Sequence, residues 1–165
     1  MDYKKIIEKL NLVKHPEGGY YSETYRSEGI IPKSVLSDNH TGDRNYSTLI
    51  YYMLSGNDIS CLHRLPSDET WHFYAGSRLI IYTIDDKGKL NTVKLGNNLN
   101  EGEVFHCVIK AGLWFGAEIE DKSSYTLMGC TVSPGFHFDD FEIASRDELL
   151  KKFPQHKETI IKLTE

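Results

Sequence analysis

The segment from Ser60 to Gly76 contains three side chains that can bind a metal or move a proton: His63, Glu69 and His72. Imidazole and carboxylate groups are common general acids and bases in enzymes, and both also bind divalent metals. The residues Pro66–Asp68 interrupt the strand-like sequence between His63 and Glu69, which predicts a tight turn. We therefore predict that the three side chains converge on one cavity as an active site.

The strands on either side of this turn must position the three groups. Side chains alternate between the two faces of a strand, so His63 points the same way as its apolar second neighbours and is expected at the mouth of an apolar pocket. His72 follows Glu69 by three residues, which would place them on opposite faces of an unbroken strand. Convergence therefore requires Glu69 to lie in the turn, or a β-bulge near residues 70–71.

Strand signals recur along the chain, with turn residues instead of helix-length segments between them. The predicted strands are 20–26, 47–54, 59–64, 70–74, 78–84, 90–95, 104–109, 113–117 and 125–132. This pattern is typical of antiparallel hairpins in a sandwich or barrel, so we predict an all-β fold. Short flanking helices are expected at both ends. One starts near Asp2 with Val13 on its apolar side, and others cover 147–153 and continue through 161, packing on the outside of the barrel.

Four residues in these strands are candidates for ligand binding. Glu23 and Arg26 are either an ordinary surface pair on an edge strand or groups placed over a pocket. Tyr52 and His106 are the other two candidates. The segment 30–45 is rich in Pro, Asp, Asn and Gly, and it is predicted to be a long mobile loop that could cover a site.

The composition limits the class of protein. A chain of 165 residues is expected to form a single domain over 1–165. The net charge of -5 and the lack of a basic stripe argue against nucleic-acid binding. The charged amino terminus resembles neither a secretory signal nor a membrane span, so a cytoplasmic location is expected. The cysteines are odd in number and widely separated, which favours buried thiols over a disulfide framework.

Other histidines and aromatic residues have simpler expected roles. The histidines predicted to lie at the surface are His15, His40, His137 and His156. The aromatic residues predicted to fill the barrel, instead of stacking on a sugar, are Trp71, Phe73, Trp114 and Phe115.

Four motifs between His15 and about Pro154 carry a family resemblance. In order, they are HPEGGYYSETYRS, HRLPSDETWHFYAG, KAGLWFGAE and GCTVSPGFHFDDFE. Together they resemble a cupin subfamily of unknown function that is also labelled predicted sugar epimerase. The resemblance implies a double-stranded β-helix, which is a jelly-roll-like barrel, with a ligand pocket inside and a homodimeric assembly.

The resemblance also bears on metal binding. Cupin motifs supply four metal ligands, and His63 and Glu69 match two of them. Leu65 and Phe115 occupy the positions of the other two, both histidines in the family pattern. Half of the usual cupin ligand set is thus absent, and no cofactor is expected. A divalent metal is possible only if the site recruits further ligands, for which the candidates are His72 and His106.

The resemblance suggests a chemistry that the residues could perform. Epimerising a carbon next to a carbonyl group requires a base, an acid and a group that stabilises the enolate. His63 could be the base, Glu69 could orient its ring, and a tyrosine such as Tyr74 could be the acid. With His72, these are the predicted catalytic residues.

The leading hypothesis is therefore an isomerase or epimerase acting on a carbohydrate-like carbonyl compound, with a sugar or nucleotide sugar as ligand. Two alternatives stay open. One is a non-catalytic cupin that binds a small metabolite, and the other is a metal-dependent cupin enzyme with a rearranged ligand set.

Overall fold

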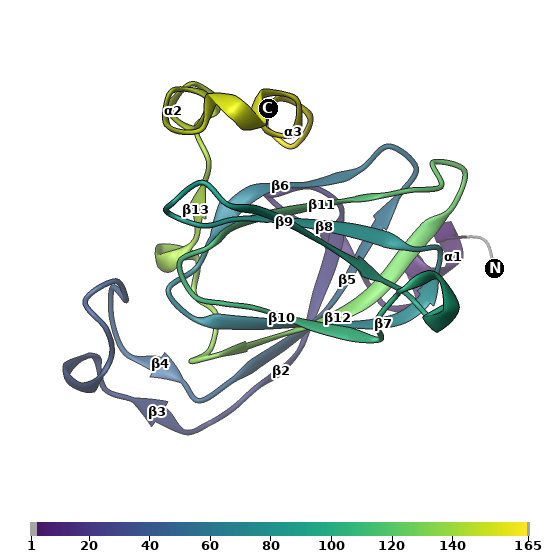
Figure 1. The fold of residues 1–165 in the computed structure, drawn as a ribbon. Coiled ribbons are helices and arrows are strands. Elements are labelled where there is room, and N and C mark those ends of the chain that lie inside the picture. The colour runs from purple at the N-terminus through teal and green to yellow at the C-terminus, as the bar shows by residue number, and fades with distance from the viewer. Residues whose placement is uncertain (1–2, 165) are drawn as a thin grey trace.

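The structure is a computed structural model, and it describes residues 3–164. Within these residues, two antiparallel sheets face each other as the walls of a barrel (Figure 1). The larger sheet has the strand order β1 (Val13–Lys14), β2 (Tyr20–Arg26), β5 (Thr48–Ser55), β12 (Tyr125–Ser133), β7 (Asp68–Gly76) and β10 (His106–Ile109). The smaller sheet has the order β13 (Glu142–Ile143), β6 (Ile59–Arg64), β11 (Trp114–Ile119), β8 (Leu79–Ile84) and β9 (Leu90–Leu95). The predicted all-β class is confirmed.

Large apolar side chains fill part of the barrel interior. Trp71 and Phe115 are 1% and 2% exposed, and their rings meet edge to face at 6.1 Å between centroids. Their expected place in the core is confirmed. Burying an apolar side chain of this kind stabilises the fold by about 1.5–3 kcal/mol. Cys61 and Cys130 are buried and Cys107 is half-buried, as the sequence predicted for the thiols.

Short helices flank the barrel at both ends, as predicted. At the amino end, α1 covers Tyr3–Lys9; Asp2 lies outside the described residues. Val13 is not part of this helix but lies exposed in β1. At the carboxyl end, α2 (Arg146–Lys152), a 3-10 turn η4 (Pro154–His156) and α3 (Lys157–Lys162) lie outside the smaller sheet (Figure 1).

These carboxyl-terminal helices bury one face of the smaller sheet. Their apolar residues include Leu149, Phe153 and Ile160, and they pack with Leu62 and Trp114. Trp114 was expected in the barrel core, but it belongs to this outer cluster because neighbours on a strand point to opposite faces and Phe115 takes the inward position.

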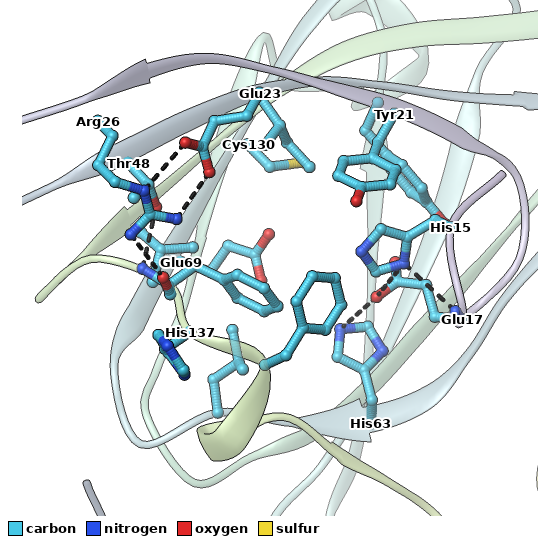
Figure 2. A pocket seen from close by; sticks show the side chains of 16 residues that line it. His15, Glu17, Tyr21, Glu23, Arg26, Thr48, His63, Glu69, Cys130 and His137 are labelled. Atoms are coloured by element: carbon cyan, nitrogen blue, oxygen red, sulfur yellow. Dashed lines mark hydrogen bonds and ion pairs between the residues drawn. The ribbon is translucent and has the colours of Figure 1, made fainter. Parts of the chain in front are cut away.

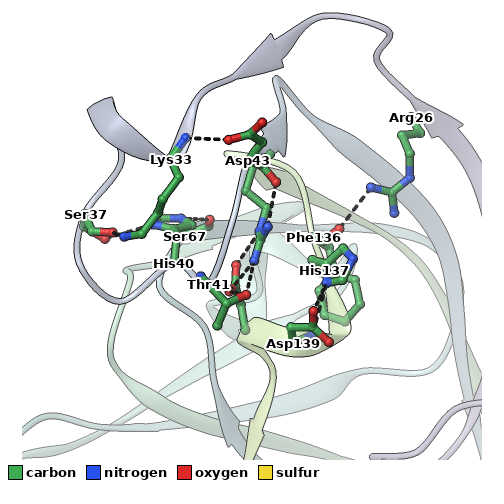
Figure 3. Close-up of polar contacts among 12 residues, drawn as sticks. Arg26, Lys33, Ser37, His40, Thr41, Asp43, Ser67, Phe136, His137 and Asp139 are labelled. Atoms are coloured by element: carbon green, nitrogen blue, oxygen red, sulfur yellow. Dashed lines mark hydrogen bonds and ion pairs between the residues drawn. The ribbon is translucent and has the colours of Figure 1, made fainter.

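The segment 30–45 is structured, so the prediction of a mobile loop is wrong. β3 (Ile30–Ile31) pairs with β4 (Arg44–Asn45), and a 3-10 turn η1 (Lys33–Val35) lies between them. Arg44 is 4% exposed, and its Nε donates to the Asp140 carboxylate at 2.6 Å. This buried pair joins the hairpin to the 3-10 turn η3 (Phe138–Asp140). Figure 3 shows the polar contacts of this region. A further 3-10 turn, η2 (Leu99–Glu101), follows β9.

Candidate functional site

A cavity of about 440 Å³ lies between the two sheets (Figure 2). Strands β2, β5, β6, β7 and β12 line it, together with segments 15–17 and 136–138. Figure 2 shows one polar group of residues, His15, Glu17, Tyr21 and His63, across the cavity from a second, Glu23, Arg26, Glu69 and His137. A concave space of this size with an apolar wall and a few polar groups is typical of a small-molecule site.

His63 and Glu17 form a buried pair in the cavity wall. His63 is only 2% exposed, so it lies inside the barrel and not at its mouth as predicted. Its Nδ1 lies 2.7 Å from the Cys61 carbonyl oxygen, which can only accept, so Nδ1 carries a hydrogen. Its Nε2 lies 3.3 Å from Oε2 of Glu17. A hydrogen on Nε2 would point at this carboxylate oxygen, so His63 and Glu17 can share one proton between these two atoms.

The turn before β2 places Glu17 in the cavity. Gly18 has φ 109°, and a Cβ at this position would lie 2.1 Å from the Ile59 carbonyl oxygen. Only glycine fits this close approach. The Glu17 carbonyl oxygen accepts from the Cys61 amide at 2.8 Å, and the Ser60 hydroxyl donates to the Glu17 carboxylate at 2.9 Å. The turn therefore fixes Glu17 against β6, next to His63.

His15 belongs to the same group, which corrects the prediction that it is a surface residue. It is 9% exposed, and its Nδ1 accepts from the Glu17 amide at 3.3 Å. In the neutral ring, Nε2 then carries the hydrogen. Burial lowers the pKa of His15, which favours this neutral form. The ring meets Tyr21 edge to face at 4.6 Å between centroids.

Glu69 lines the cavity from β7 as an uncharged acid. Burial, and then the negative charge of Glu17, raise the pKa of Glu69 to about 8. Its carboxyl group therefore holds a proton at neutral pH and can donate it. The expectation that Glu69 orients the His63 ring is wrong, because the carboxylate next to that ring in the described chain is Glu17.

Glu23 and Arg26 both line the cavity, because a register shift interrupts β2 between Glu23 and Tyr25. Simple alternation would have sent the two residues to opposite faces, but a bulge turns them to the same side. The Arg26 guanidinium donates to both Glu23 carboxylate oxygens, at 2.9 and 2.7 Å. Tyr52 also lines the cavity, and its hydroxyl donates to the Gly18 carbonyl oxygen at 3.0 Å.

The structure does not bring His72 to the cavity, so the predicted convergence of three groups is wrong for this residue. β7 pairs with β12 without interruption from Asp68 to Phe73, and the register shift comes only beyond, between Leu127 and Met128 of β12. No bulge therefore turns His72 inward. Its Nε2 instead lies 3.1 Å from the Thr131 hydroxyl on the outer face.

The other two candidates on this side also miss the cavity. Tyr74 is 46% exposed, and its ring meets Tyr51 outside the barrel. His106 is exposed on β10, and its ring centroid lies 6.3 Å from the ring centroid of His72. Neither residue lines the cavity that contains His63 and Glu69.

The residues around His63 do not fit a cupin metal centre. Leu65 lines the cavity, and the ring centroids of Phe115 and His63 are 4.0 Å apart. Apolar side chains therefore occupy both missing ligand positions. Across residues 3–164, no three His, Cys, Asp or Glu side chains are placed to hold a metal ion. The rearranged ligand set is not assembled, because His72 and His106 lie on the outer face.

The other histidines expected at the surface differ in their environments. His40 is 4% exposed, and its ring nitrogens lie within hydrogen-bond distance of the Ser37 and Ser67 hydroxyls, as Figure 3 shows. His137 lines the cavity but keeps about half of its side chain exposed. His156 is partly buried, with Nε2 2.7 Å from the Gly88 carbonyl oxygen.

Sequence reasoning missed His15, Glu17 and Tyr21 as cavity residues. A signal was present, since an acid and a histidine stand beside Gly18-Gly19 in the HPEGGYY motif. Glycine pairs of this kind mark a tight approach of one backbone to another. The sequence gives no sign, however, that the approached strand is the one carrying His63.

Comparison with known proteins identifies the relatives of this chain. The model of the family described as Cupin superfamily (DUF985) matches residues 4–144. A solved structure of a protein from Shewanella oneidensis is 39% identical, with a TM-score of 0.91, and the match covers 100% of this chain and 98% of that one. An uncharacterized protein of Saccharomyces cerevisiae is 28% identical over 157 residues, or 90% of this chain and 78% of the yeast protein.

A more distant structure supports the fold. Oxalate decarboxylase from Bacillus subtilis is 15% identical, with a TM-score of 0.55, and the match covers 92% of this chain and 37% of that one. At this identity the likeness concerns the fold alone, and the predicted double-stranded β-helix is confirmed. In the described part of the chain, none of the helices has the length and apolar character needed to cross a membrane.

Proposed function

This chain belongs to the cupin superfamily, in the family described as DUF985, and from that premise we propose that it is a small-molecule enzyme that moves a proton on a carbohydrate-like carbonyl compound. The reaction class is that of an isomerase or sugar epimerase. The observation that carries this proposal is the pairing of His63 with Glu17, in a cavity that also contains the protonated acid Glu69.

The His63–Glu17 pair supplies the base. In its proton-free form, the Nε2 lone pair faces a carboxylate oxygen at 3.3 Å, and taking up a proton removes this repulsion. The pair can therefore accept the proton from a carbon next to the carbonyl group, whose bonding electrons move onto the carbonyl oxygen as an enolate. The Cys61 carbonyl, which binds Nδ1, fixes the ring for this step.

Glu69 supplies the acid. It holds its own proton at neutral pH and lies across the cavity from the pair (Figure 2). Delivery of this proton to the opposite face of the enolate carbon completes an epimerisation and leaves Glu69 ionised and the pair protonated. Tyr21 also lines the cavity, and its hydroxyl can stabilise the enolate oxygen.

Deuterium exchange tests this function. The protein is incubated in D₂O with aldoses and ketoses, and NMR follows deuterium at the carbon next to the carbonyl. We expect exchange with the wild type and its loss in E17Q and H63N. In the control H72N, whose side chain is outside the cavity, exchange should continue. A sugar that binds without any exchange would favour the second candidate, a non-catalytic metabolite-binding cupin, which the apolar residues at two ligand positions of the family support.

A further inference from the structure

We propose that the cavity selects uncharged ligands, so that its substrate is a free sugar and not a sugar phosphate or nucleotide sugar. This inference rests on the proposed function for the reacting groups, but its argument comes from the charges of the cavity. Sugar phosphates and nucleotide sugars both carry negative phosphate groups. The charge of a phosphate monoester at pH 7 is about -1.5 to -2. A site for them requires positive charge or several free N–H donors.

The cavity wall has little positive charge to offer. Among the described residues that line it, Arg26 is the single Lys or Arg, against the three carboxyl groups of Glu17, Glu23 and Glu69. Bringing a phosphate into a partly buried space with this balance would cost both its hydration and the repulsion from the carboxylates.

Most of the hydrogen-bond donors of Arg26 are already used within the protein. Besides its two bonds to Glu23, its third nitrogen donates to the Asn45 side-chain oxygen at 2.9 Å and to the Phe136 carbonyl oxygen at 3.1 Å. Four of the five N–H groups of a guanidinium are thereby used. A phosphate would have to displace a bidentate carboxylate, and Arg26 instead fixes the 136–138 segment at the cavity.

The histidines of the cavity do not replace the missing cation. Nε2 of His63 faces the Glu17 carboxylate, so positive charge on this ring would be paired within the protein, and the buried position of His15 favours its neutral form. His137 accepts a hydrogen bond at Nδ1 from the Asp139 amide, and the Asp139 carboxylate lies 3.4 Å away. Each imidazole is therefore neutral or already has an acidic neighbour.

Uncharged groups complete the cavity. Its apolar wall includes Ile50, Leu65, Val132 and the rings of Phe136 and Phe138, which can pack on the C–H face of a sugar ring. Hydroxyl and carboxyl groups of Tyr21 and Glu69 can bind sugar hydroxyls without placing a net charge next to them. The arrangement matches an unphosphorylated, hydroxyl-rich ring compound.

The first experiment asks whether the cavity accepts an anion, with inorganic phosphate as the probe and NMR amide shifts of cavity residues as the measurement. E23Q removes the negative charge that pairs with Arg26. E142Q is the matched control. Both carboxylate oxygens of Glu142 accept from Arg64, at 2.6 and 3.0 Å, and neither residue lines this cavity. We expect no cavity shifts up to about 20 mM phosphate in wild type or E142Q, and clear shifts in E23Q.

The second experiment uses the wild type alone, so it does not depend on the folding of a variant. Affinities are measured for matched pairs: glucose and glucose 6-phosphate, fructose and fructose 6-phosphate, ribose and ribose 5-phosphate. Tighter binding of the free sugar in a pair supports the inference. It is overturned if the phosphorylated member binds more tightly, if phosphate shifts cavity residues of the wild type, or if none of the free sugars binds.

These outcomes are separable from those of the proposed function. If a free sugar binds but no deuterium is exchanged into it, the proton-transfer function is wrong and the charge selectivity still holds. A sugar phosphate that binds more tightly and exchanges deuterium would overturn the selectivity and leave the proton transfer intact.

Discussion

Nε2 of His63 lies 3.3 Å from Oε2 of Glu17, and both residues are almost completely buried. The two come from separate elements, β6 and the turn before β2, which the hydrogen bond from the Cys61 amide to the Glu17 carbonyl oxygen holds together. This pairing has a structural as well as a chemical consequence, because removing either partner leaves the other buried without its neighbour.

The first prediction concerns this coupling. H63N and E17Q should each lower the free energy of unfolding by about 2–5 kcal/mol, and a double-mutant cycle should give a coupling of about 1–3 kcal/mol. The control cycle uses the exposed pair Arg64–Glu142, for which R64Q and E142Q should couple by less than about 1 kcal/mol. Urea denaturation measures both cycles. Equal couplings in the two cycles would show that burial does not strengthen the interaction of His63 with Glu17.

The second prediction concerns pH. Burial raises the pKa of Glu69 from 4.5 to about 8, so the folded state keeps a proton that the unfolded state releases between these values. Stability should therefore fall as pH rises through this window, by on the order of a few kcal/mol. E69Q has no such proton, and its stability should fall less over the same range. Denaturation of both proteins at pH 5 and pH 8.5 gives the comparison, and identical pH slopes would contradict it.

The third prediction separates the residues inside the cavity from those outside. H72N and Y74F change the outer face of the larger sheet, where neither side chain reaches the cavity. Both variants should keep the affinity for a bound sugar within about twofold of wild type. A tenfold loss in either would mean that the outer face takes part in the site.

The fourth prediction concerns metal. Because Leu65 and Phe115 occupy ligand positions of the family, protein purified without added metal should contain far less than stoichiometric Zn, Mn, Fe or Ni. Chelator should leave the unfolding midpoint unchanged to within about 2 °C, since no bound ion contributes to stability. Elemental analysis and thermal melts provide the measurements. A stoichiometric metal that resists dialysis would support the metal-dependent alternative.

The fifth prediction concerns assembly. We propose a twofold-symmetric homodimer with β2 near the interface, since a partner would cover exposed strand edges and residues such as Tyr25, which is 54% exposed. Light scattering should give twice the chain mass of 18.9 kDa, and Y25R should shift the protein toward the monomer. A wild-type mass near that of one chain at micromolar concentration would rule the dimer out.

Local sequence patterns were sufficient to predict the class of fold and most of its strands. Period-two patterns such as that of residues 59–64 predicted β6 with its observed bounds, and the pattern of 20–26 did the same for β2. Local chemistry was sufficient here, because alternating branched and aromatic residues between turn-forming residues favour a strand wherever the chain goes. His63 and Glu69 were found in the same way, from their place on either side of a turn.

Which groups share the cavity depends on contacts that arise only when the whole chain folds. Alternation separates Glu23 from Arg26, but a bulge in β2 brings them together, whereas the absence of a bulge in the first half of β7 keeps His72 outside. Glu17 meets His63 only because its turn packs on β6. Bulges and contacts between distant segments depend on the register of whole sheets, which is set by the packing of both faces and not by the residues of one strand.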